Sequence, residues 1–268
     1  MATTLIAQIT DPHIVANARL CLNQIDTASF LRTAVETIRD LPTPPDAVLV
    51  TGDLVNDGRA NQYEHLRILL APLPMPVLLM PGNHDDRSAL REAFPHHGEL
   101  GTGDTCDFVQ TVAALRLIGL DTSVEGEAGG DLSDRQLEWF DRTLSAAPGA
   151  PTLVAMHHPP FRTGIAHMDE QGLSPSAADA LEQIVRANPQ VERVTCGHLH
   201  RTISRRWAGT VVATVPSVAH AVALDLRDES HGAWNYEPPF VTLHHWNGSA
   251  LVTHQVASGE FPSRRYGG

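Results

Sequence analysis

Short apolar segments alternate with helical patterns through the first 200 residues of this 268-residue chain. The apolar segments that we expect to form β-strands are residues 4–10, 47–51, 77–80, 115–120, 152–156 and 191–196. Strands that alternate with amphipathic helices are typical of a layered α/β domain, in which helices cover the faces of a sheet. This alternation is the strongest constraint that the sequence places on the fold.

Helix signals fill the intervals between these strands. The expected helices are residues 27–41, 62–70 and 86–94, a helix opened by the capping-box pattern Ser133 to Gln136, and a helix from Ser174-Pro175 to about residue 186. Asp86 is expected to cap the helix that follows it.

The pattern changes after residue 200. β-like runs cover residues 201–207, 210–215, 240–246 and 250–256, whereas residues 217–239 show no clear period. We therefore expect one domain over residues 1–216, with residues 217–268 forming a small C-terminal cap or dimerisation appendage and the final strands that complete the same domain.

Polar clusters follow five of the predicted strands. The candidate metal ligands in these clusters are Asp11, His13, Asp53, Asn83, His157, His198 and His200. Ligands of open α/β sheets bind beyond the carboxyl ends of strands, so the five clusters can converge on one crevice. Side chains two residues apart in an extended segment point to the same side. Asp11 and His13, and likewise His198 and His200, can therefore bind one ion together.

The chemistry of these side chains restricts what they could bind. Imidazole nitrogens with carboxylate and amide oxygens, and no thiolate, suit iron, manganese, zinc or cobalt. Seven donors are too many for one tetrahedral ion and about right for two ions that share a ligand, and Asp53 is the best candidate for the shared carboxylate. Two ions about 3.5–4 Å apart can hold a hydroxide nucleophile and clamp a phosphoryl group.

Composition excludes several other functions. Every fixed cation is arginine, which excludes a P-loop lysine, a Schiff-base lysine and a pyridoxal-phosphate anchor. A formal net charge of −12 argues against binding along a nucleic-acid polymer. The apolar runs are too short to span a bilayer, and three cysteines without paired spacing fit a reducing cytoplasm.

The ordered motifs resemble the calcineurin-like metallophosphoesterase superfamily. These motifs are Asp11-x-His13, Gly52-Asp53, Gly82-Asn83-His84-Asp85, His157 and Gly197-His198-x-His200, and residues 52–56, 82–86 and 156–160 most resemble class III cyclic-nucleotide phosphodiesterases and a bacterial glycerophosphodiesterase group. The resemblance implies a four-layer αββα sandwich. It implies that Asp11, His13, Asp53 and His200 bind a first metal ion, and that Asp53, Asn83, His157 and His198 bind a second.

The same resemblance implies that His84 faces the substrate phosphate and stabilises charge or protonates the leaving oxygen. It implies that Asn83 and His220 also contact substrate, and Asn56 is a further candidate contact. We expect His158, adjacent to His157, to be structural, Asp85 to hold a histidine or cap a turn, and His244 and His245 to be surface or capping residues.

The sequence thus predicts a cytoplasmic phosphodiesterase with a binuclear metal centre and no organic cofactor. Its catalytic residues are Asp53 and His84, its substrates are small diesters such as cyclic AMP or glycerophosphodiesters, and its metal-bound hydroxide attacks phosphorus. Iron and manganese are the first candidates for the ions, and the protein is expected to form a dimer-based homo-oligomer. A phosphomonoesterase, a nucleotide pyrophosphatase and a protein-binding scaffold of the same fold are the alternatives.

Overall fold

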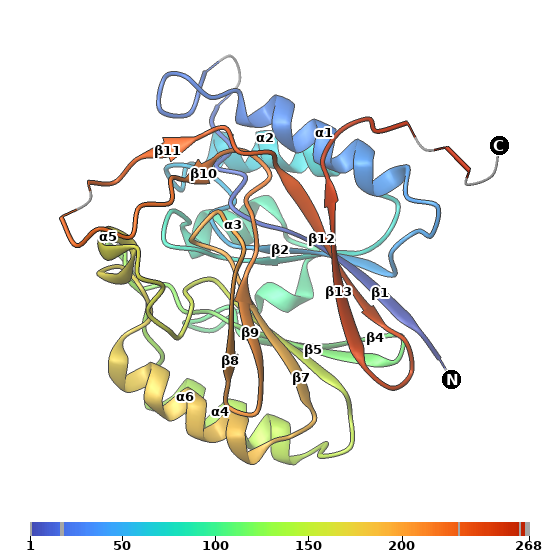
Figure 1. Cartoon of the computed structure of the whole chain (residues 1–268), viewed down its shortest axis with the longest axis vertical. Helices are drawn as coiled ribbons and strands as arrows, with labels where there is room; N and C mark the ends of the chain where they lie inside the picture. The colour runs from blue at the N-terminus through green and yellow to red at the C-terminus, as the bar shows by residue number, and fades with distance from the viewer. Residues whose placement is uncertain (1, 17–18, 230, 263, 266–268) are drawn as a thin grey trace.

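Two β-sheets packed face to face, with helices on both outer sides, make up the chain (Figure 1). The structure is a computed structural model, and it describes residues 2–16, 19–229, 231–262 and 264–265. The order of layers, helix–sheet–sheet–helix, confirms the predicted four-layer α/β sandwich. In the described ranges, no helix combines the length and apolar character that crossing a membrane requires.

The first sheet has five strands in the order β13-β12-β1-β2-β3. Strands β1 (Thr4–Ile9), β2 (Ala47–Thr51) and β3 (Val77–Met80) run parallel, and β12 (Phe240–Trp246) pairs antiparallel with β1. Strand β13 (Leu251–Ala257) forms the outer edge. The C-terminal strands therefore extend the sheet that the N-terminal strand begins.

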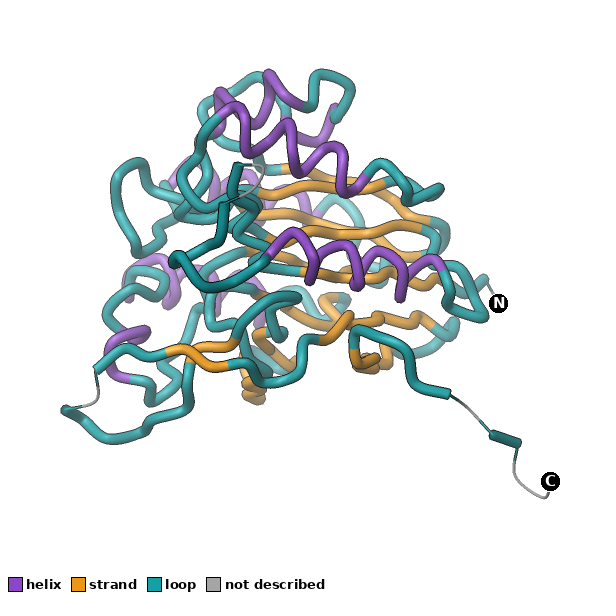
Figure 2. The backbone as a smooth tube through the Cα atoms, turned by 90° about the horizontal axis from the view of Figure 1, so that it is seen from above, coloured by secondary structure: helices purple, strands orange, loops and turns teal. Residues whose placement is uncertain are grey.

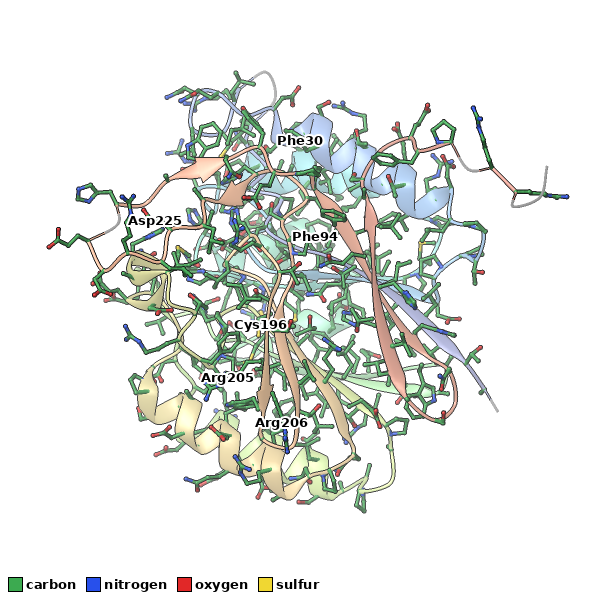
Figure 3. The ribbon with its side chains drawn as sticks, in the orientation of Figure 1. Phe30, Phe94, Cys196, Arg205, Arg206 and Asp225 are labelled. Carbon is green, nitrogen blue, oxygen red and sulfur yellow. The ribbon has the colours of Figure 1, made fainter. Side chains whose placement is uncertain are left out.

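The second sheet has six strands in the order β4-β5-β6-β7-β9-β8. Their bounds are β4 (Phe108–Val112), β5 (Leu115–Leu120), β6 (Thr152–Met156), β7 (Val191–Cys196), β8 (Ile203–Trp207) and β9 (Thr210–Thr214). Strands β5, β6, β7 and β9 are parallel, so their carboxyl ends lie at one edge. Cys196, the last residue of β7, is labelled near the centre of Figure 3.

Three helices cover the first sheet and two long helices cover the second (Figures 1 and 2). They are α1 (Thr27–Arg39), α2 (Ala60–Leu70) and α3 (Arg87–Ala93) on the first, and α4 (Asp134–Ser145) and α6 (Pro175–Ala187) on the second. The apolar stripe of α1 packs on the first sheet, where α1 contacts β12, whereas Phe140 and Leu181 belong to the cluster that covers β6 and β7. A separate apolar cluster fills the space between the sheets.

The predicted helix signals are confirmed in detail. Ser133 and Gln136 form the reciprocal capping box of α4, and Ser174 caps α6, whose first residue is Pro175. The side chain of Asp86 accepts a hydrogen bond from the backbone N–H of Ala89 at the start of α3. Each cap satisfies a backbone donor that the first helical turn leaves free.

Five elements were absent from the prediction. These are strand β4, the 3₁₀ turn η1 (Gly98–Leu100), the four-residue helix α5 (Ala166–Asp169), and a hairpin of β10 (Ala221–Val222) and β11 (Trp234–Asn235). Two-residue strands are too short for a periodic pattern, which is why residues 217–239 showed none. The hairpin lies above α5 in Figure 1.

The prediction that His244 is a surface or capping residue is wrong. His244 lies on β12, an inner strand, and its side chain is fully buried between the sheets. Its Nε2 is 2.8 Å from Oε1 of Gln8, and its Nδ1 is 3.0 Å from the Thr253 hydroxyl. The same Gln8 oxygen accepts a hydrogen bond from Thr195 on β7, so this polar network joins the two sheets.

Candidate metal centre

All seven predicted metal ligands lie at the carboxyl ends of strands from both sheets. Asp11 and His13 follow β1, Asp53 follows β2, and Asn83 follows β3. From the second sheet, His157 follows β6, and His198 and His200 follow β7. The sandwich therefore brings residues from opposite ends of the chain to one edge, as the strand-end argument predicts.

One cluster contains Asp11, His13, Asp53 and His200, whose candidate ligand atoms all lie within 4.8 Å of one another. Nε2 of His13 lies 3.1 Å from Nε2 of His200 and 3.5 Å from Oδ2 of Asp53. Nε2 of His200 lies 3.3 Å from Oδ1 of Asp11. Two nitrogens and two carboxylates thus point at one buried spot, which is the donor set of a first metal site.

A second group lies on the other side of Asp53. Nε2 of His157 is 3.4 Å from Oδ1 of Asp53 and 3.1 Å from Oδ1 of Asn83. The rings of His157 and His198 are 5.1 Å apart. Within the described residues, Nε2 of His198 is buried without a hydrogen-bond partner, which is costly unless that nitrogen binds something.

Asp53 occupies the position that a bridging ligand requires. One of its carboxylate oxygens faces His13 and the other faces His157, and its side chain is 3% exposed. This geometry, with nitrogen and oxygen donors on both sides, fits two transition-metal ions that share one carboxylate.

Backbone carbonyls orient two of the ligand histidines. Nδ1 of His157 lies 2.9 Å from the carbonyl oxygen of Thr51, and Nδ1 of His200 lies 3.0 Å from that of His220. A neutral imidazole that donates through Nδ1 presents a lone pair at Nε2, the atom that faces the cluster in both residues. Each ring is therefore oriented so that its neutral form would present the Nε2 lone pair to the cluster.

The electrostatics of the site also favour a cation. Burial lowers the pKa of His157, but the nearby Asp53 carboxylate raises it, with a net value of about 10. Burial opposes ionisation of Asp53 as well, yet the charges of His157 and His13 hold the pKa of this carboxyl well below its usual range. A proton on His157 thus balances buried negative charge, and a metal ion would replace that proton.

The backbone at the site is strained where the ligands turn inward. Asp11, His13, Asp53, His198 and His200 all have φ between 43° and 68°. This left-handed region costs roughly 1–3 kcal/mol for a residue with a side chain and persists where the surroundings enforce it. A Cβ on Gly52 would lie 2.3 Å from Nδ1 of His157, and one on Gly82 would lie 2.3 Å from Oδ1 of Asp53. The two motif glycines therefore make room for ligands.

Asp85 holds two of the ligand loops together. Its carboxylate accepts hydrogen bonds from the backbone N–H groups of Leu54 (3.0 Å), Val55 (3.3 Å) and Gly82 (2.8 Å). The buried hydroxyl of Tyr63 on α2 donates to Asp85 at 2.9 Å and accepts from the N–H of Asp86 at 2.8 Å. Asp85 thus caps chain turns, one of its two predicted roles, and positions both Asp53 and Asn83.

His84 is the exposed member of the site. Its ring lies 4.7 Å from that of His13, its Nδ1 is 2.8 Å from the carbonyl oxygen of Asn56, and its backbone N–H donates to Oδ1 of Asp53. Nε2 therefore remains as the ring nitrogen that can meet a substrate. The Asn56 side chain is engaged elsewhere, with Asp57 and with the thiol of Cys21, so its backbone carbonyl is what reaches the site.

His220 and His158 border the two clusters. The ring of His220 lies 4.6 Å from that of His200 and 5.6 Å from that of His13, and its side chain is 9% exposed. His158 packs 4.7 Å from His198, while its nitrogens face the Thr122 hydroxyl at 2.8 Å and the Ala128 carbonyl at 3.2 Å. The candidate ligand atoms of His157, His158 and His198 lie within 4.8 Å of one another, but both nitrogens of His158 face other partners. We therefore assign His158 to support of the ligands, the structural role predicted for it.

Sequence reasoning missed the groups that orient the ligands. The carbonyl oxygens of Thr51, Asn56 and His220 carry no residue-specific signal, because every residue has one. The sequence pattern indicates that Tyr63 is a core residue of an amphipathic helix. Only the structure shows that its hydroxyl also binds Asp85, which holds the ligand loops. Thr10 is the exception, because it directly precedes the first motif in the sequence. Its hydroxyl donates to Oδ2 of Asp11 at 2.6 Å.

The comparisons with known proteins agree with this geometry. The model of the calcineurin-like phosphoesterase family matches residues 4–202. The chain belongs to this family.

Two curated relatives cover most of both chains. A probable glycerophosphodiester phosphodiesterase of Arcobacter nitrofigilis is 33% identical, over 96% of this chain and 94% of the relative. A probable cyclic nucleotide phosphodiesterase of Rhodopseudomonas palustris is 35% identical, over 93% and 90%. A dimetal phosphatase from Danio rerio has the same fold, with a TM-score of 0.65 at 17% identity over 96% of this chain and 99% of that one.

Proposed function

We propose that this protein hydrolyses small phosphodiesters with the help of two transition-metal ions. The observation that carries the proposal is the position of Asp53, whose two carboxylate oxygens face donor groups on opposite sides. The family and the names of the two curated relatives support a phosphodiesterase. Cyclic nucleotides and glycerophosphodiesters are the two candidate substrate classes.

Seven side chains would hold the ions. Asp11, His13 and His200 serve the first, Asn83, His157 and His198 serve the second, and Asp53 serves both. When bound, the two ions supply water activation and neutralise negative charge on the phosphoryl oxygens. Iron and manganese are the proposed pair, with zinc or cobalt as alternatives, and no organic cofactor is required.

His84 is the proposed general acid. Its Nδ1–H donates to the Asn56 carbonyl, so the proton that an imidazolium can give to a leaving alkoxide lies on Nε2. Asn83 and His220, half-buried and nearly buried beside the two clusters, are the proposed substrate contacts. The predicted contact through the Asn56 side chain becomes, in this proposal, a backbone contact that positions His84.

The remaining proposals concern the protein as a whole. We propose a cytoplasmic, dimer-based homo-oligomer, with residues 1–216 forming the catalytic domain. Residues 217–268 would provide the cap and the strands that complete it. Size-exclusion chromatography with light scattering would test the oligomeric state.

The activity is tested by measuring turnover of bis-p-nitrophenyl phosphate and p-nitrophenyl phosphate side by side. The protein is first stripped with a chelator and then reloaded with Mn²⁺. Preference for the diester supports the proposal, and preference for the monoester would make the protein a phosphomonoesterase. Absence of metal-dependent turnover on either compound would favour the scaffold alternative.

A further inference from the structure

A series of contacts links His84 to the hairpin of β10 and β11 beside the metal centre. His84 contacts the Asn56 backbone, and Oδ1 of Asn56 accepts from the thiol of Cys21 at 3.2 Å. Trp234 of β11 packs against the apolar cluster that contains Cys21, and its ring centre lies 6.0 Å from that of His220. His220 in turn contacts His13, which contacts His84. Trp234 and His84 are thus both parts of one rim.

The hairpin that carries Trp234 is anchored to the metal site. Arg201, which directly follows His200, donates to the carbonyl oxygen of Val222 at 2.5 Å and pairs with Glu237 at 3.1 Å. His220, directly before β10, accepts the hydrogen bond from His200. These contacts fix both strands of the hairpin relative to the first cluster, so the position of Trp234 is built into the site.

Three aromatic side chains make up the hairpin side of the rim, which we call the aromatic wall: Phe30, Trp234 and Tyr236. The ring of Tyr236 lies 5.2 Å from that of Trp234 and stacks 6.2 Å from that of Phe30. Phe30 and Trp234 are partly exposed, and Tyr236 is 57% exposed. Phe30 is labelled in Figure 3, as is Asp225 on the hairpin segment. Aromatic residues make up only 5% of the chain, so this concentration beside a catalytic site is unusual for it.

We propose that Trp234 is a specificity-determining residue that stacks on the nucleobase of the substrate. This inference rests on the proposed phosphodiesterase function and narrows it to diesters that carry a nucleobase, such as a nucleoside 3′,5′-cyclic phosphate. A planar base offers the π-face that an aromatic wall binds, whereas the glycerol of an acyclic diester offers only hydroxyls. Arg201 and Glu237 form an ion pair beside the hairpin, so neither presents an unpaired charge to the substrate on this side.

The inference is tested by comparing two diesters on the Mn²⁺-loaded protein: cyclic AMP, which carries a base, and glycerophosphoethanolamine, which does not. Loss of a base-stacking ring typically weakens binding by about tenfold to a hundredfold. W234L should therefore lower kcat/KM for cyclic AMP by at least about tenfold, mainly through KM, and leave the glycerol diester within about twofold. W234F, which retains a ring, should restore most of the preference.

Two further variants separate recognition from folding. Tyr236 is exposed, so Y236L removes a neighbouring ring with little effect on the core and should cause a smaller loss in the same direction. Leu224, 57% exposed on the same hairpin segment, provides the matched control, and L224A should leave both substrates unchanged. Equal losses on both diesters in W234L and Y236L, or no loss in either, would overturn the inference.

A binding measurement separates failure of this inference from failure of the proposed function. Equilibrium dialysis of AMP and of glycerol 3-phosphate requires no turnover. Wild-type protein should bind AMP more tightly, and W234L should reduce AMP binding alone. If the wild type hydrolyses neither diester but shows this difference, the base site stands and the catalytic proposal fails. If both diesters are hydrolysed and AMP binding is insensitive to W234L, the base site is wrong.

Discussion

The floor of the site and its hairpin rim are built in different ways. The floor consists of the seven candidate ligands, which lie at strand ends of two sheets and are mostly buried. Four of them form side-chain hydrogen bonds with backbone groups: Asp11, Asp53, His157 and His200. The rim between Ala221 and Glu237 consists of two-residue strands and half-exposed aromatic rings. Under the two proposals above, the floor would perform the chemistry and the rim would select the substrate.

The largest expected effect comes from removing the shared carboxylate of the floor. D53A should lose both ions and lower diester turnover by about a thousandfold or more, because it removes the only residue assigned to both sites. Metal content per chain, together with turnover of bis-p-nitrophenyl phosphate, would check this. D225A, which removes a carboxylate from the hairpin segment, is the matched control and should retain metal and turnover. A D53A protein with two ions and normal turnover would refute the bridging role.

The next largest effect is expected at His84, the exposed residue between floor and rim. H84A should retain metal but lose about a hundredfold or more in kcat for an alkyl diester, since general acid catalysis typically contributes that much. The loss should be smaller for bis-p-nitrophenyl phosphate, whose leaving group needs little protonation. H96A removes an exposed histidine elsewhere and should behave as wild type. Wild-type turnover of an alkyl diester by H84A would exclude the acid role.

Two tyrosine-to-phenylalanine variants, one below the floor and one in the rim, should differ in their affinity for Mn²⁺. Y63F deletes the hydroxyl that bonds Asp85 and should weaken Mn²⁺ binding by about tenfold, as supporting contacts of metal ligands typically do. Y236F deletes the exposed hydroxyl that reaches the Gln24 carbonyl and should leave Mn²⁺ binding unchanged. Titration with Mn²⁺ measures both, and equal affinities in the two variants would show that Tyr63 does not position the ligand loops.

The prediction with the smallest expected effect on metal binding and turnover concerns the polar network between the sheets, below the floor. Burial, with a contribution from Arg193, lowers the pKa of His244 to about 3. An unfolded chain has a histidine pKa near 6.5, so it binds this proton first as the pH falls. The contribution of neutral His244 to the free energy of unfolding is fully present above about pH 6.5. It decreases by about 1.4 kcal/mol per pH unit between pH 6.5 and pH 3.

Urea unfolding of metal-free protein between pH 7 and pH 4 would measure this slope. H244Q retains hydrogen-bonding groups but does not titrate, so its stability should fall less steeply than that of the wild type. H245Q changes the half-exposed neighbour and should keep the wild-type slope. Identical slopes for H244Q and the wild type would contradict the assigned burial of a neutral His244.

The sequence predicted the floor far better than the rim, and the reason is physical. Buried strands such as Ala47–Thr51 are continuous apolar runs, and the residues after them must meet at one edge of a parallel sheet. Asp53 and His157 could therefore be brought together by reasoning alone. The hairpin has no such period, and Trp234 is positioned by the apolar cluster that contains Cys21 and by His220, which lie elsewhere in the sequence.

The errors have a similar origin. His244 and His245 look alike in the sequence, and only the place of β12 between β1 and β13 decides which of them is enclosed. The strand β4, with an exposed centre at the sheet edge, lacked a continuous apolar run. The family resemblance supplied the roles of the ligands, while the orienting carbonyls and the Tyr63–Asp85 contact required the structure.

The central claim, two ions joined by Asp53, is tested most directly by counting Mn²⁺ ions per chain. Equilibrium dialysis followed by atomic absorption should give two ions for the wild type. It should give one each for H200A and H157A, which damage different sites, and none for D53A at the same Mn²⁺ concentration. One ion per chain in the wild type, or the same count in D53A as in the wild type, would contradict the account.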